Sequence, residues 1–354
     1  MSRTKGALGK KNKMKIFKEE KLTIKDQKIN EKELNNLDKI VEKDIKKEEA
    51  KLTKEQQERK DRLNNTLRDL NKKFGKVAIK YANTIEERAR IPFKNKYLTE
   101  FTGGGIPKGT YTTLWGSKGC AKTTIALDLI SYVQSTGGIC IYINGERSYD
   151  PVWAQKRGVD TEKLVVVNVT TIEEGLDTVI KLCREKVADL IIFDSLHGLA
   201  PSGELFEGKA KTEKSVAQDT MALRARKLTQ FFEMATPFVA ESKCAIVLIG
   251  QSRMDLGSFI KIETLTGGHA LLHNSRLILK LRRGQGADAP VKKEKVEVIE
   301  GINEEGEKIK KIKTIEIKIG FSLILRIDKS QISGCIEGQE LRLSFYFEEG
   351  LKED

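Results

Sequence analysis

The sequence lacks the features that mark several classes of protein. It has no run of 18 uninterrupted apolar residues, and charges stand near its start where a signal peptide needs an apolar segment, so we expect neither a membrane-spanning helix nor a secretion signal. Its five cysteines are scattered and form no C-x-x-C pair, which favours reduced core residues in a cytosolic protein over a disulfide framework. Its three histidines have no metal-ligand spacing. No serine, histidine and aspartate arrangement typical of nucleophilic catalysis stands out either.

The composition indicates a globular core with a charged extension. Of the 354 residues, 39% are hydrophobic, which is enough for a buried core, while 32% are charged, which is high for a purely globular chain. The length suits one large domain plus an extension, or two domains. The net charge of +13 makes a polyanionic partner such as nucleic acid reasonable, although Lys and Glu also solvate exposed helices.

The N-terminal part of the chain differs in composition from the rest. Residues 1–60 are rich in Lys and Glu and poor in aromatic residues, so we expect a charged arm that is either partly disordered or helical. The apolar positions that follow step by four, three and four, which predicts a helix with one apolar face, ending at Gly75. These positions are Leu63, Leu67, Leu70 and Phe74.

From residue 110 onward, strand and helix patterns alternate. Apolar runs predict strands at 111–115, 138–143, 164–169, 190–194 and 244–249, and helical patterns lie at 124–132, 150–156 and 172–183. This alternation predicts an α/β fold around a mostly parallel, buried sheet.

The segments beyond residue 273 alternate apolar and polar residues and are joined by turn residues. They lie at 276–282, 295–299, 313–319, 322–327 and 341–347, and we expect antiparallel strands at the edge of the sheet. The predicted parts are therefore the arm at 1–60, a helix and polar connection at 61–101, and a core at 102–354.

The segment from Gly116 to Thr124 has the pattern of a phosphate-binding loop. It follows an apolar strand and opens a helix, so backbone N–H groups and the helix N-terminus would meet an anion. Lys122 would reach the terminal phosphates, and the hydroxyl of Thr123 would ligate magnesium. The predicted nucleotide-binding residues here are Gly116, Ser117, Lys118, Gly119, Cys120, Ala121, Lys122, Thr123 and Thr124.

Ala121 departs from the strict pattern, which has a second glycine at this position. If the backbone there needs a positive φ, Ala costs about 1 kcal/mol. Gly119 would relieve that strain if it took over the turn.

Three polar residues end apolar runs, at the sheet edge where open parallel sheets bind ligands. Asp194 is placed as the carboxylate of a magnesium site, Glu146 to activate water, and Gln251 to sense the terminal phosphate. Taken singly, each has an ordinary structural explanation as a helix cap, a surface charge or a loop residue. Their common placement after a phosphate loop favours catalysis.

Two segments combine basic residues with glycine or apolar side chains, which suits binding to single-stranded DNA. Cations would track phosphates, and apolar side chains would insert between bases. Mere surface insertions remain the alternative. The candidate DNA-binding residues are Lys209, Lys211, Lys214, Arg253, Met254, Phe259, Lys261, Gly267 and Gly268.

Several segments, in their residues and in their order along the chain, resemble segments of the RecA recombinases of bacteria and their phages. The matching segments are 65–76, 143–160, 194–201, 251–257 and 264–270, and the resemblance covers 64–351. It implies a RecA-like P-loop ATPase core, with ATP and Mg²⁺ as cofactors, in the cytoplasm of a bacterial cell or a phage-infected host.

The resemblance also implies roles for individual residues and partners. It places the catalytic role on Glu146 and adenine contacts on Asp150 and Trp153. The N-terminal helix would dock on a neighbouring subunit of a filament formed on single-stranded DNA, with double-stranded DNA as a second partner.

Two further departures accompany Ala121. The sequence stops soon after Leu351, so we expect no C-terminal domain like that of the bacterial members. Where the family has two lysines that reach the neighbour's ATP, only Lys329 fits, and the second position is Gln331.

The leading functional hypothesis is a DNA-dependent ATPase that forms filaments and promotes homologous pairing and strand exchange. Lys122, Glu146, Gln251 and Lys329 would be its catalytic residues, and Thr123 and Asp194 its metal-site residues. One alternative is a ring-forming DNA helicase on the same core. Another is a nucleotide-gated DNA-binding scaffold with weak hydrolysis.

Overall fold

A computed structural model describes residues 54–74, 82, 87–202, 216–254, 263–265, 269–284, 289–302 and 308–352. The chain divides into two compact units, residues 1–86 and residues 87–354. The described helix of the first unit is α3, Lys54–Phe74. It includes the predicted apolar positions and ends before Gly75, as expected, but it begins inside the segment predicted to be the charged arm. Leu63 and Phe74 are about half exposed, at 50% and 53%.

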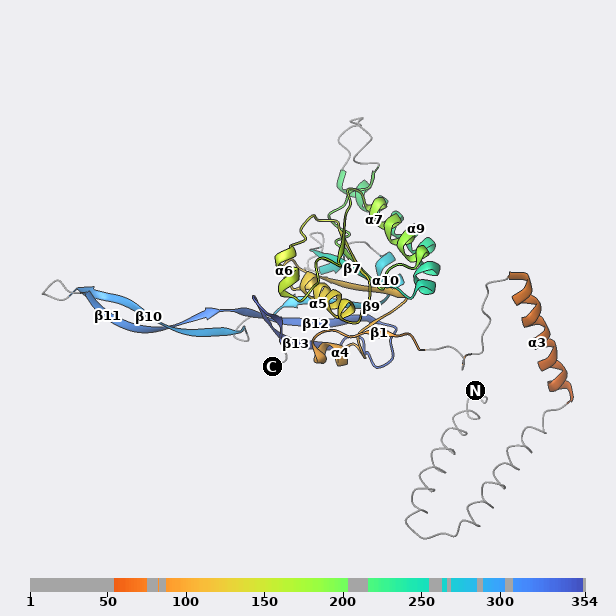
Figure 1. The fold of residues 1–354 in the computed structure, drawn as a ribbon, viewed down its shortest axis with the longest axis horizontal. Coiled ribbons are helices and arrows are strands. Elements are labelled where there is room, and N and C mark those ends of the chain that lie inside the picture. Colours follow the sequence, from red (N-terminus) through yellow and green to blue (C-terminus); the bar gives the residue numbers. More distant parts are fainter. Residues whose placement is uncertain are drawn as a thin grey trace, which may run out of the picture. The chain divides into compact units, whose positions relative to one another are not determined.

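The second unit is built on a ten-stranded sheet in the order β14-β13-β12-β9-β3-β7-β6-β4-β5, with β8 paired to β7 (Figure 1). Neighbouring strands from β9 to β5 pair in parallel. Their bounds are Thr110–Gly116 for β3, Cys140–Asn144 for β4, Val165–Asn168 for β5, Leu190–Asp194 for β6, Ala245–Met254 for β7 and Ser275–Arg283 for β9. The antiparallel strands are β8 (Glu263–Leu265), β12 (Gly320–Ser330), β13 (Glu340–Tyr346) and β14 (Gly350–Leu351). The predicted α/β class with a mostly parallel sheet and antiparallel edge strands is confirmed.

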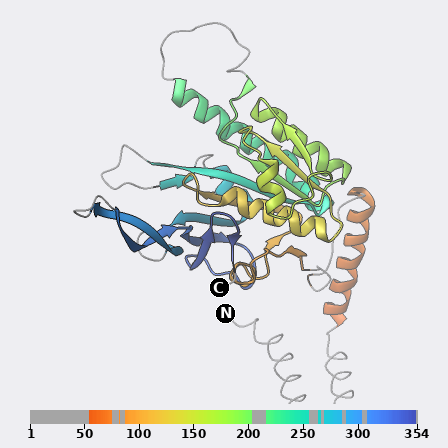
Figure 2. The same ribbon diagram turned by 60° about the vertical axis from the view of Figure 1, so that its left-hand side comes forward.

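Helices cover both faces of this sheet, because its inner strands are apolar on both sides. One buried cluster joins the sheet to α4 (Lys96–Phe101), α5 (Lys122–Ser135) and α6 (Pro151–Lys156). The other joins the opposite face to α7 (Ile172–Glu185), α9 (Val216–Ser242) and α10 (His269–Asn274). Figure 2 shows α7 and α9 lying side by side on that second face.

The segment 88–101, expected to be a polar connection, belongs instead to the compact second unit. It forms β1 (Arg90–Ile91), which pairs with β2 (Ile106–Pro107), and the short helix α4. Ile91, Phe93 and Leu98 are buried. Three apolar side chains spread through a polar stretch give no periodic signal, so the sequence pattern missed this element.

The prediction that all strands beyond residue 273 are antiparallel edge strands is wrong for β9. Strand β9 pairs in parallel with β3 and antiparallel with β12, so it lies inside the sheet. Its residues Leu277, Ile278, Leu279 and Leu281 are fully buried. Only Leu277 to Leu279 are consecutive apolar residues, so the charged residues around them gave the strand the pattern of an edge strand.

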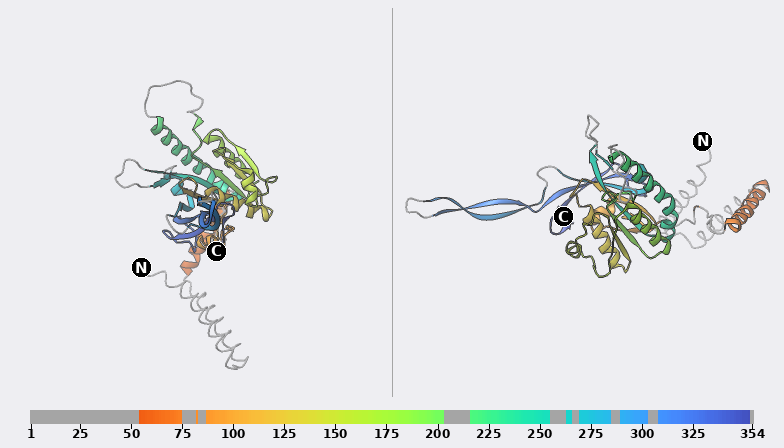
Figure 3. Two further views of the ribbon diagram at one scale, coloured as in Figure 1. Left: turned by 90° about the vertical axis from the view of Figure 1, so that its left-hand side faces the viewer. Right: turned by 90° about the horizontal axis from the view of Figure 1, so that it is seen from above.

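Strands β10 (Val291–Ile302) and β11 (Lys308–Lys318) also differ from the prediction, since they form a sheet of their own. They appear as a long twisted ribbon in Figures 1 and 3. Opposed residues on this ribbon often combine a charge with an apolar side chain, as in Lys292 with Ile317 and Glu294 with Ile315. A ribbon with no continuous apolar face has little to gain from joining the core sheet.

Candidate functional site

The predicted phosphate loop connects the carboxyl end of β3 to the first turn of α5. Gly116 ends the strand with a φ of 149°. A Cβ atom there would lie 1.9 Å from the carbonyl oxygen of Leu281 on β9. Only glycine fits where the two backbones approach this closely.

Ala121 precedes α5 in the left-handed region, with a φ of 66°. Gly119 is also left-handed, with a φ of 73°. Gly119 therefore does not take over the turn, and the loop retains a strained alanine at a cost of about 1 kcal/mol.

Lys122 lies at the centre of this loop and is 8% exposed. Its Nζ donates hydrogen bonds to the carbonyl oxygens of Gly116, at 3.0 Å, and Ser117, at 2.7 Å. Lys118 is exposed on the outside of the loop. The ammonium of Lys122 is thus held within the cradle that a phosphate group would enter.

Thr123 and Asp194, predicted to form a metal site, lie in direct contact. The Thr123 hydroxyl donates to Asp194 Oδ2 at 2.6 Å, and the Tyr142 hydroxyl donates to the same oxygen at 2.7 Å. Burial raises the pKa of the Asp194 carboxyl, while these two hydrogen bonds oppose the rise. Hydroxyl and carboxylate oxygens beside a phosphate cradle are the protein donors that Mg²⁺ uses with nucleotides, so this set fits the metal.

Glu146 and Gln251 also meet at this edge, from the ends of β4 and β7. Gln251 Nε2 donates to Glu146 Oε1 at 2.6 Å, and the Ser195 hydroxyl donates to the same oxygen. The backbone N–H of Gln251 donates to His197 Nδ1 at 3.3 Å. Gln251 belongs to β7 and not to a loop. Its side-chain amide therefore links the Glu146 carboxylate to that strand.

Glu146 borders an open cavity of about 520 Å³. Arg147 and Thr170 line its other sides, together with residues 198–200. The candidate DNA-binding residues Lys209, Lys211 and Lys214 follow residues 198–200 in the sequence. These three lysines lie outside the described residues.

The two residues predicted to contact adenine lie at the start of α6. Asp150 caps this helix, accepting hydrogen bonds from the backbone N–H groups of Val152 and Trp153. Trp153 Nε1 donates to the hydroxyl of Thr124 at 3.3 Å. The indole therefore lies against the first turn of α5, next to the phosphate loop.

Lys329 is not brought to the phosphate loop of its own chain. It lies on β12, where its Nζ donates to the carbonyl oxygens of Leu272 and His273 in α10. A catalytic role for Lys329 would require a nucleotide that is not bound in the phosphate loop of its own chain.

The predicted second DNA-binding segment is described in part. Arg253 and Met254 belong to β7 and pair with Thr264 and Glu263 of β8, so the backbone there is a strand and not a flexible loop. Phe259, Lys261, Gly267 and Gly268 lie outside the described residues.

Sequence reasoning missed three residues of this site: Tyr142, Ser195 and Arg283. Ser195 directly follows Asp194, and Tyr142 lies two residues before the end of β4, so their proximity to the strand ends was a usable signal. Arg283 Nε donates to the carbonyl oxygen of Gly119 at 2.9 Å. That contact depends on the pairing of β9 with β3, which no local pattern indicates.

None of the helices that the structure describes is long and apolar enough to cross a membrane.

Comparisons with known proteins find similarity to one family. Residues 61–339 match the model of the RecA N-terminal domain family. The chain is 35% identical over 181 residues to "Protein RecA" of Agrobacterium fabrum, covering 51% of this chain and 48% of that protein. It is 34% identical over 223 residues to "Protein RecA" of Brucella anthropi (61% and 60%) and 32% identical over 228 residues to "Protein RecA" of Arthrospira platensis (63% and 60%). The matched part thus spans about half to three fifths of these relatives.

Proposed function

The chain belongs to the RecA family, and on that premise we propose that it is a DNA-dependent ATPase. It would assemble into filaments on single-stranded DNA and promote homologous pairing and strand exchange with a duplex. Its relatives are named "Protein RecA", and the geometry of the site supports the same class of activity.

The observation that carries the proposal is the meeting of a lysine and two pairs of residues at one edge of the sheet. Lys122 lies in the phosphate cradle, Thr123 contacts Asp194, and Gln251 contacts Glu146. These residues come from the ends of β3, β6, β4 and β7, and the edge is the one where open parallel sheets bind ligands.

Each residue has a distinct role in hydrolysis. When bound, Mg²⁺ would neutralise charge on the phosphates of ATP. Lys122 would bind the terminal phosphates, and Thr123 and Asp194 would supply the metal's protein oxygens. Glu146, held by Ser195 and Gln251, would orient a water molecule and accept its proton.

The Gln251 amide offers a physical route from nucleotide to DNA. It donates to Glu146 at one end, and its own strand, β7, continues to Arg253 and Met254 at the other. A change in what the amide contacts would therefore shift the strand that leads into the predicted second DNA-binding segment.

Assembly would use the apolar face of α3. Leu63 and Phe74 are exposed on this helix, and burying apolar surface contributes about 25 cal/mol per Å². In the proposed filament, a second copy of the chain would bury this face.

Steady-state ATP hydrolysis, with and without single-stranded DNA, tests the proposal, together with negative-stain microscopy in a non-hydrolysable ATP analogue. We expect DNA-stimulated turnover and helical filaments. Closed rings would indicate the helicase alternative instead, and an absence of both assembly and turnover would contradict the proposal.

A second candidate, a nucleotide-gated scaffold with weak hydrolysis, is favoured by one observation. Ala121 holds a positive φ inside the phosphate loop, so the conformation that cradles phosphate costs about 1 kcal/mol more than it would with glycine there. Filaments that form with ATP but show negligible DNA-stimulated turnover would select this candidate.

A further inference from the structure

A stripe of four polar side chains runs along α5, the helix that begins at the phosphate loop. Their spacing of four, three and three residues places them on one face of the helix. Each of them forms a hydrogen bond with the segment 153–160, which comprises most of α6 and the turn after it. The four residues are Thr124, Asp128, Ser131 and Gln134.

The first two contacts of the stripe are made by α6 itself. Trp153 Nε1 donates to the hydroxyl of Thr124 at 3.3 Å. Four residues further along each segment, the side chain of Arg157 donates to the carboxylate of Asp128. The contacts therefore advance by one helical turn on both segments at once, which fixes the register of α6 on α5.

The last two contacts hold the turn after α6. The Ser131 hydroxyl donates to the carbonyl oxygen of Gly158 at 2.9 Å. The side-chain amide of Gln134 exchanges two hydrogen bonds, each of 2.9 Å, with the backbone of Asp160. The segment is thus held by α5 along its whole length.

The ion pair of Asp128 and Arg157 is the most buried and most directional of these contacts. Arg157 Nε donates to Asp128 Oδ1 and Nη2 donates to Oδ2, each at 2.8 Å. The two side chains are only 5% and 4% exposed. Arg157 Nη1 also donates to the carbonyl oxygen of Glu349. A two-point contact between planar groups fixes orientation as well as distance.

This ion pair lies one helical turn from the indole of Trp153. The backbone N–H of Arg157 donates to the carbonyl oxygen of Trp153 at 3.0 Å, and the guanidinium carbon lies 6.0 Å from the centre of the indole ring. Helix α6 has six residues, and a helix this short is not stable by itself. The position of the indole therefore depends on the contacts that hold α6 to α5.

The two helices carry different parts of the candidate nucleotide site. The first turn of α5 carries Lys122 and Thr123, which are the candidates for binding phosphate and metal. The start of α6 carries Asp150 and Trp153, which are the candidates for contacting the base. A single nucleotide can engage both ends only if α6 lies at a fixed distance from the phosphate loop.

We propose that Asp128 and Arg157 are a positioning pair that holds Trp153 where it stacks on the base of a nucleoside triphosphate whose phosphates lie in the loop. This inference rests on the proposed function, because it takes ATP as the ligand. Neither member of the pair touches the nucleotide, and both act through the indole. Loss of the pair should therefore weaken binding of a nucleotide that carries a base and spare a ligand that has phosphates alone.

Arg157→Lys tests this selectivity. Lysine keeps the positive charge but replaces the planar fork with a single ammonium group. Competition binding would measure the affinities for ATP and for inorganic triphosphate, which has no base. We expect the affinity for ATP to fall about tenfold, within the range of one base–aromatic stack, and that for triphosphate to change less than about twofold. An equal loss for both ligands, or no loss for either, would overturn the proposal.

A double-mutant cycle tests whether the pair acts through the indole. In a Trp153→Ala background, Arg157→Lys should no longer change the affinity for ATP, because the group that it positions is absent. A further loss of about tenfold in that background would mean that Arg157 affects the nucleotide by another route. That result would overturn the proposal.

A charge-free variant separates positioning from folding. Burial raises the pKa of the Asp128 carboxyl, and the charge and hydrogen bonds of Arg157 oppose the rise. Removing Arg157 alone would leave a buried carboxyl without its partner, which destabilises the fold. Asp128→Leu together with Arg157→Met removes both charges at similar volume, a change that buried ion pairs often tolerate. With the fold verified by circular dichroism, we expect the same selective loss of ATP affinity, and unchanged affinity would overturn the proposal.

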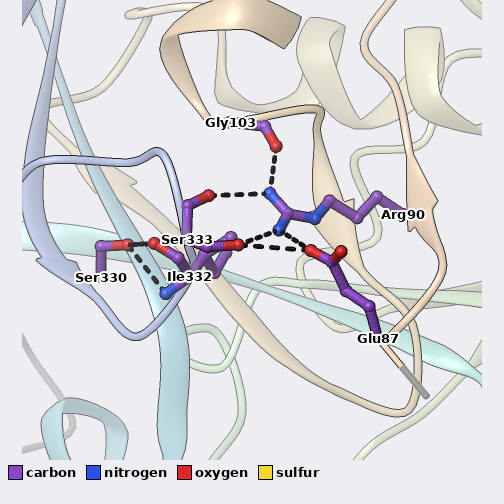
Figure 4. A network of polar contacts seen from close by, with 6 residues as sticks. All are labelled: Glu87, Arg90, Gly103, Ser330, Ile332 and Ser333. Atoms are coloured by element: carbon purple, nitrogen blue, oxygen red, sulfur yellow. Dashed lines mark hydrogen bonds and ion pairs between the residues drawn. The ribbon is translucent and has the colours of Figure 1, made fainter. Parts of the chain in front are cut away.

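Arg90 supplies the matched control, because its guanidinium also joins separate segments of the same unit (Figure 4). Its Nη2 donates to Glu87 Oε1 at 2.7 Å and to the Ser333 hydroxyl at 2.9 Å, and its Nη1 donates to the carbonyl oxygens of Gly103 and Ser333. These acceptors lie outside the phosphate loop, α5 and α6. Arg90→Lys should leave the ratio of the two affinities unchanged. The same selective loss as in Arg157→Lys would overturn the proposal, since the ratio would then report general loosening of the fold.

The parent chain distinguishes this inference from the proposed function. If Arg157→Lys selectively weakens ATP binding but the parent shows no DNA-stimulated turnover, the positioning pair stands and the proposed function fails. If the parent shows that turnover but Arg157→Lys leaves both affinities unchanged, the proposed function stands and the pair is overturned. A parent that binds ATP no more tightly than triphosphate would also overturn the pair, because there would be no base contact to position.

Discussion

Charged side chains at the two edges of the sheet have different partners. At the phosphate-loop edge, Lys122 is held by backbone carbonyls, Asp194 by two hydroxyls and Glu146 by an amide and a hydroxyl. A cavity of about 170 Å³ at the opposite edge, where β3 and β9 begin, is called here the amino-edge pocket. In the amino-edge pocket, Arg88 and Arg276 repel each other with no carboxylate between them. The first edge satisfies its charges within one chain, whereas the described residues that line the pocket include two arginines and no carboxylate.

The difference follows from the position of each edge in a parallel sheet. The N-terminus of α5 opens at the carboxyl edge, and its partial positive charge favours an anion beside the loop. None of the described residues that line the amino-edge pocket lies in the first turn of a helix, so side-chain cations alone would have to bind an anion there.

The largest expected effect is that of Lys122→Ala. Because Lys122 is the ammonium held in the phosphate cradle, its loss should lower DNA-stimulated ATP turnover at least about 100-fold. Turnover assays would compare the parent with Lys163→Ala, which removes an exposed lysine in a turn beyond α6. Near-normal turnover in Lys122→Ala would show that this edge is not the catalytic one.

Glu146→Gln should lower turnover by a comparable or smaller factor, about 100-fold, while nucleotide binding remains. The amide still accepts hydrogen bonds but cannot take a proton from water. Rapid-quench turnover and fluorescent-nucleotide binding would measure the two properties separately.

Mixing two variants of the phosphate-loop edge tests the difference between the two edges further. Glu146→Gln and Lys122→Ala alter the same edge of the same chain, so an equimolar mixture of these two should show no recovery. Recovery in that mixture would mean that Glu146 acts on a neighbour's nucleotide, and the contrast between the edges would disappear.

Ala121→Gly should stabilise the chain by about 1 kcal/mol, because glycine adopts the positive φ at this position without strain. For a unit of this size, that corresponds to a rise of about 2 °C in Tm. Ala225→Gly, inside α9, is the control and should shift Tm in the opposite direction. A fall in Tm for both variants would show that Ala121 is not strained.

The smallest effect concerns an ion pair at the amino edge. Lys108 Nζ lies 3.0 Å from Asp189 Oδ1. Burial raises the pKa of Asp189, but hydrogen bonds from the Ile139 N–H and Lys108 outweigh it, so the pKa lies below the ordinary value. The carboxylate therefore contributes stability above about pH 4, which is lost as the pH falls through the folded-state pKa.

Because both side chains are partly exposed, Asp189→Asn should destabilise the chain by only about 0.5 kcal/mol at pH 7. Urea unfolding at pH 7 and pH 3 would test this, with a smaller difference expected at pH 3. A difference that grows on acidification would mean that the sign of the shift is wrong.

Local patterns in the sequence were sufficient to predict much of the phosphate-loop edge. A strand, a glycine and a lysine before a helix predict the loop, and carboxylates that end apolar runs must lie near it because parallel strands end at one edge. Arg283 and the amino-edge pocket were not predictable in this way. Their contacts join β9 to β3 and residue 88 to residue 331, and no periodic pattern encodes such pairings.

The sequence by itself determined the class of fold, the phosphate loop and the strand-end positions of Asp194, Glu146 and Gln251, because each depends on the order of residues within about ten positions. Only the tertiary structure decided that β9 lies inside the sheet, that the Glu146 carboxylate contacts the Gln251 amide, and that Arg88 meets Arg276 in one pocket. These contacts depend on which strands pair, and strand pairing is set by the burial of whole faces and not by neighbours along the chain.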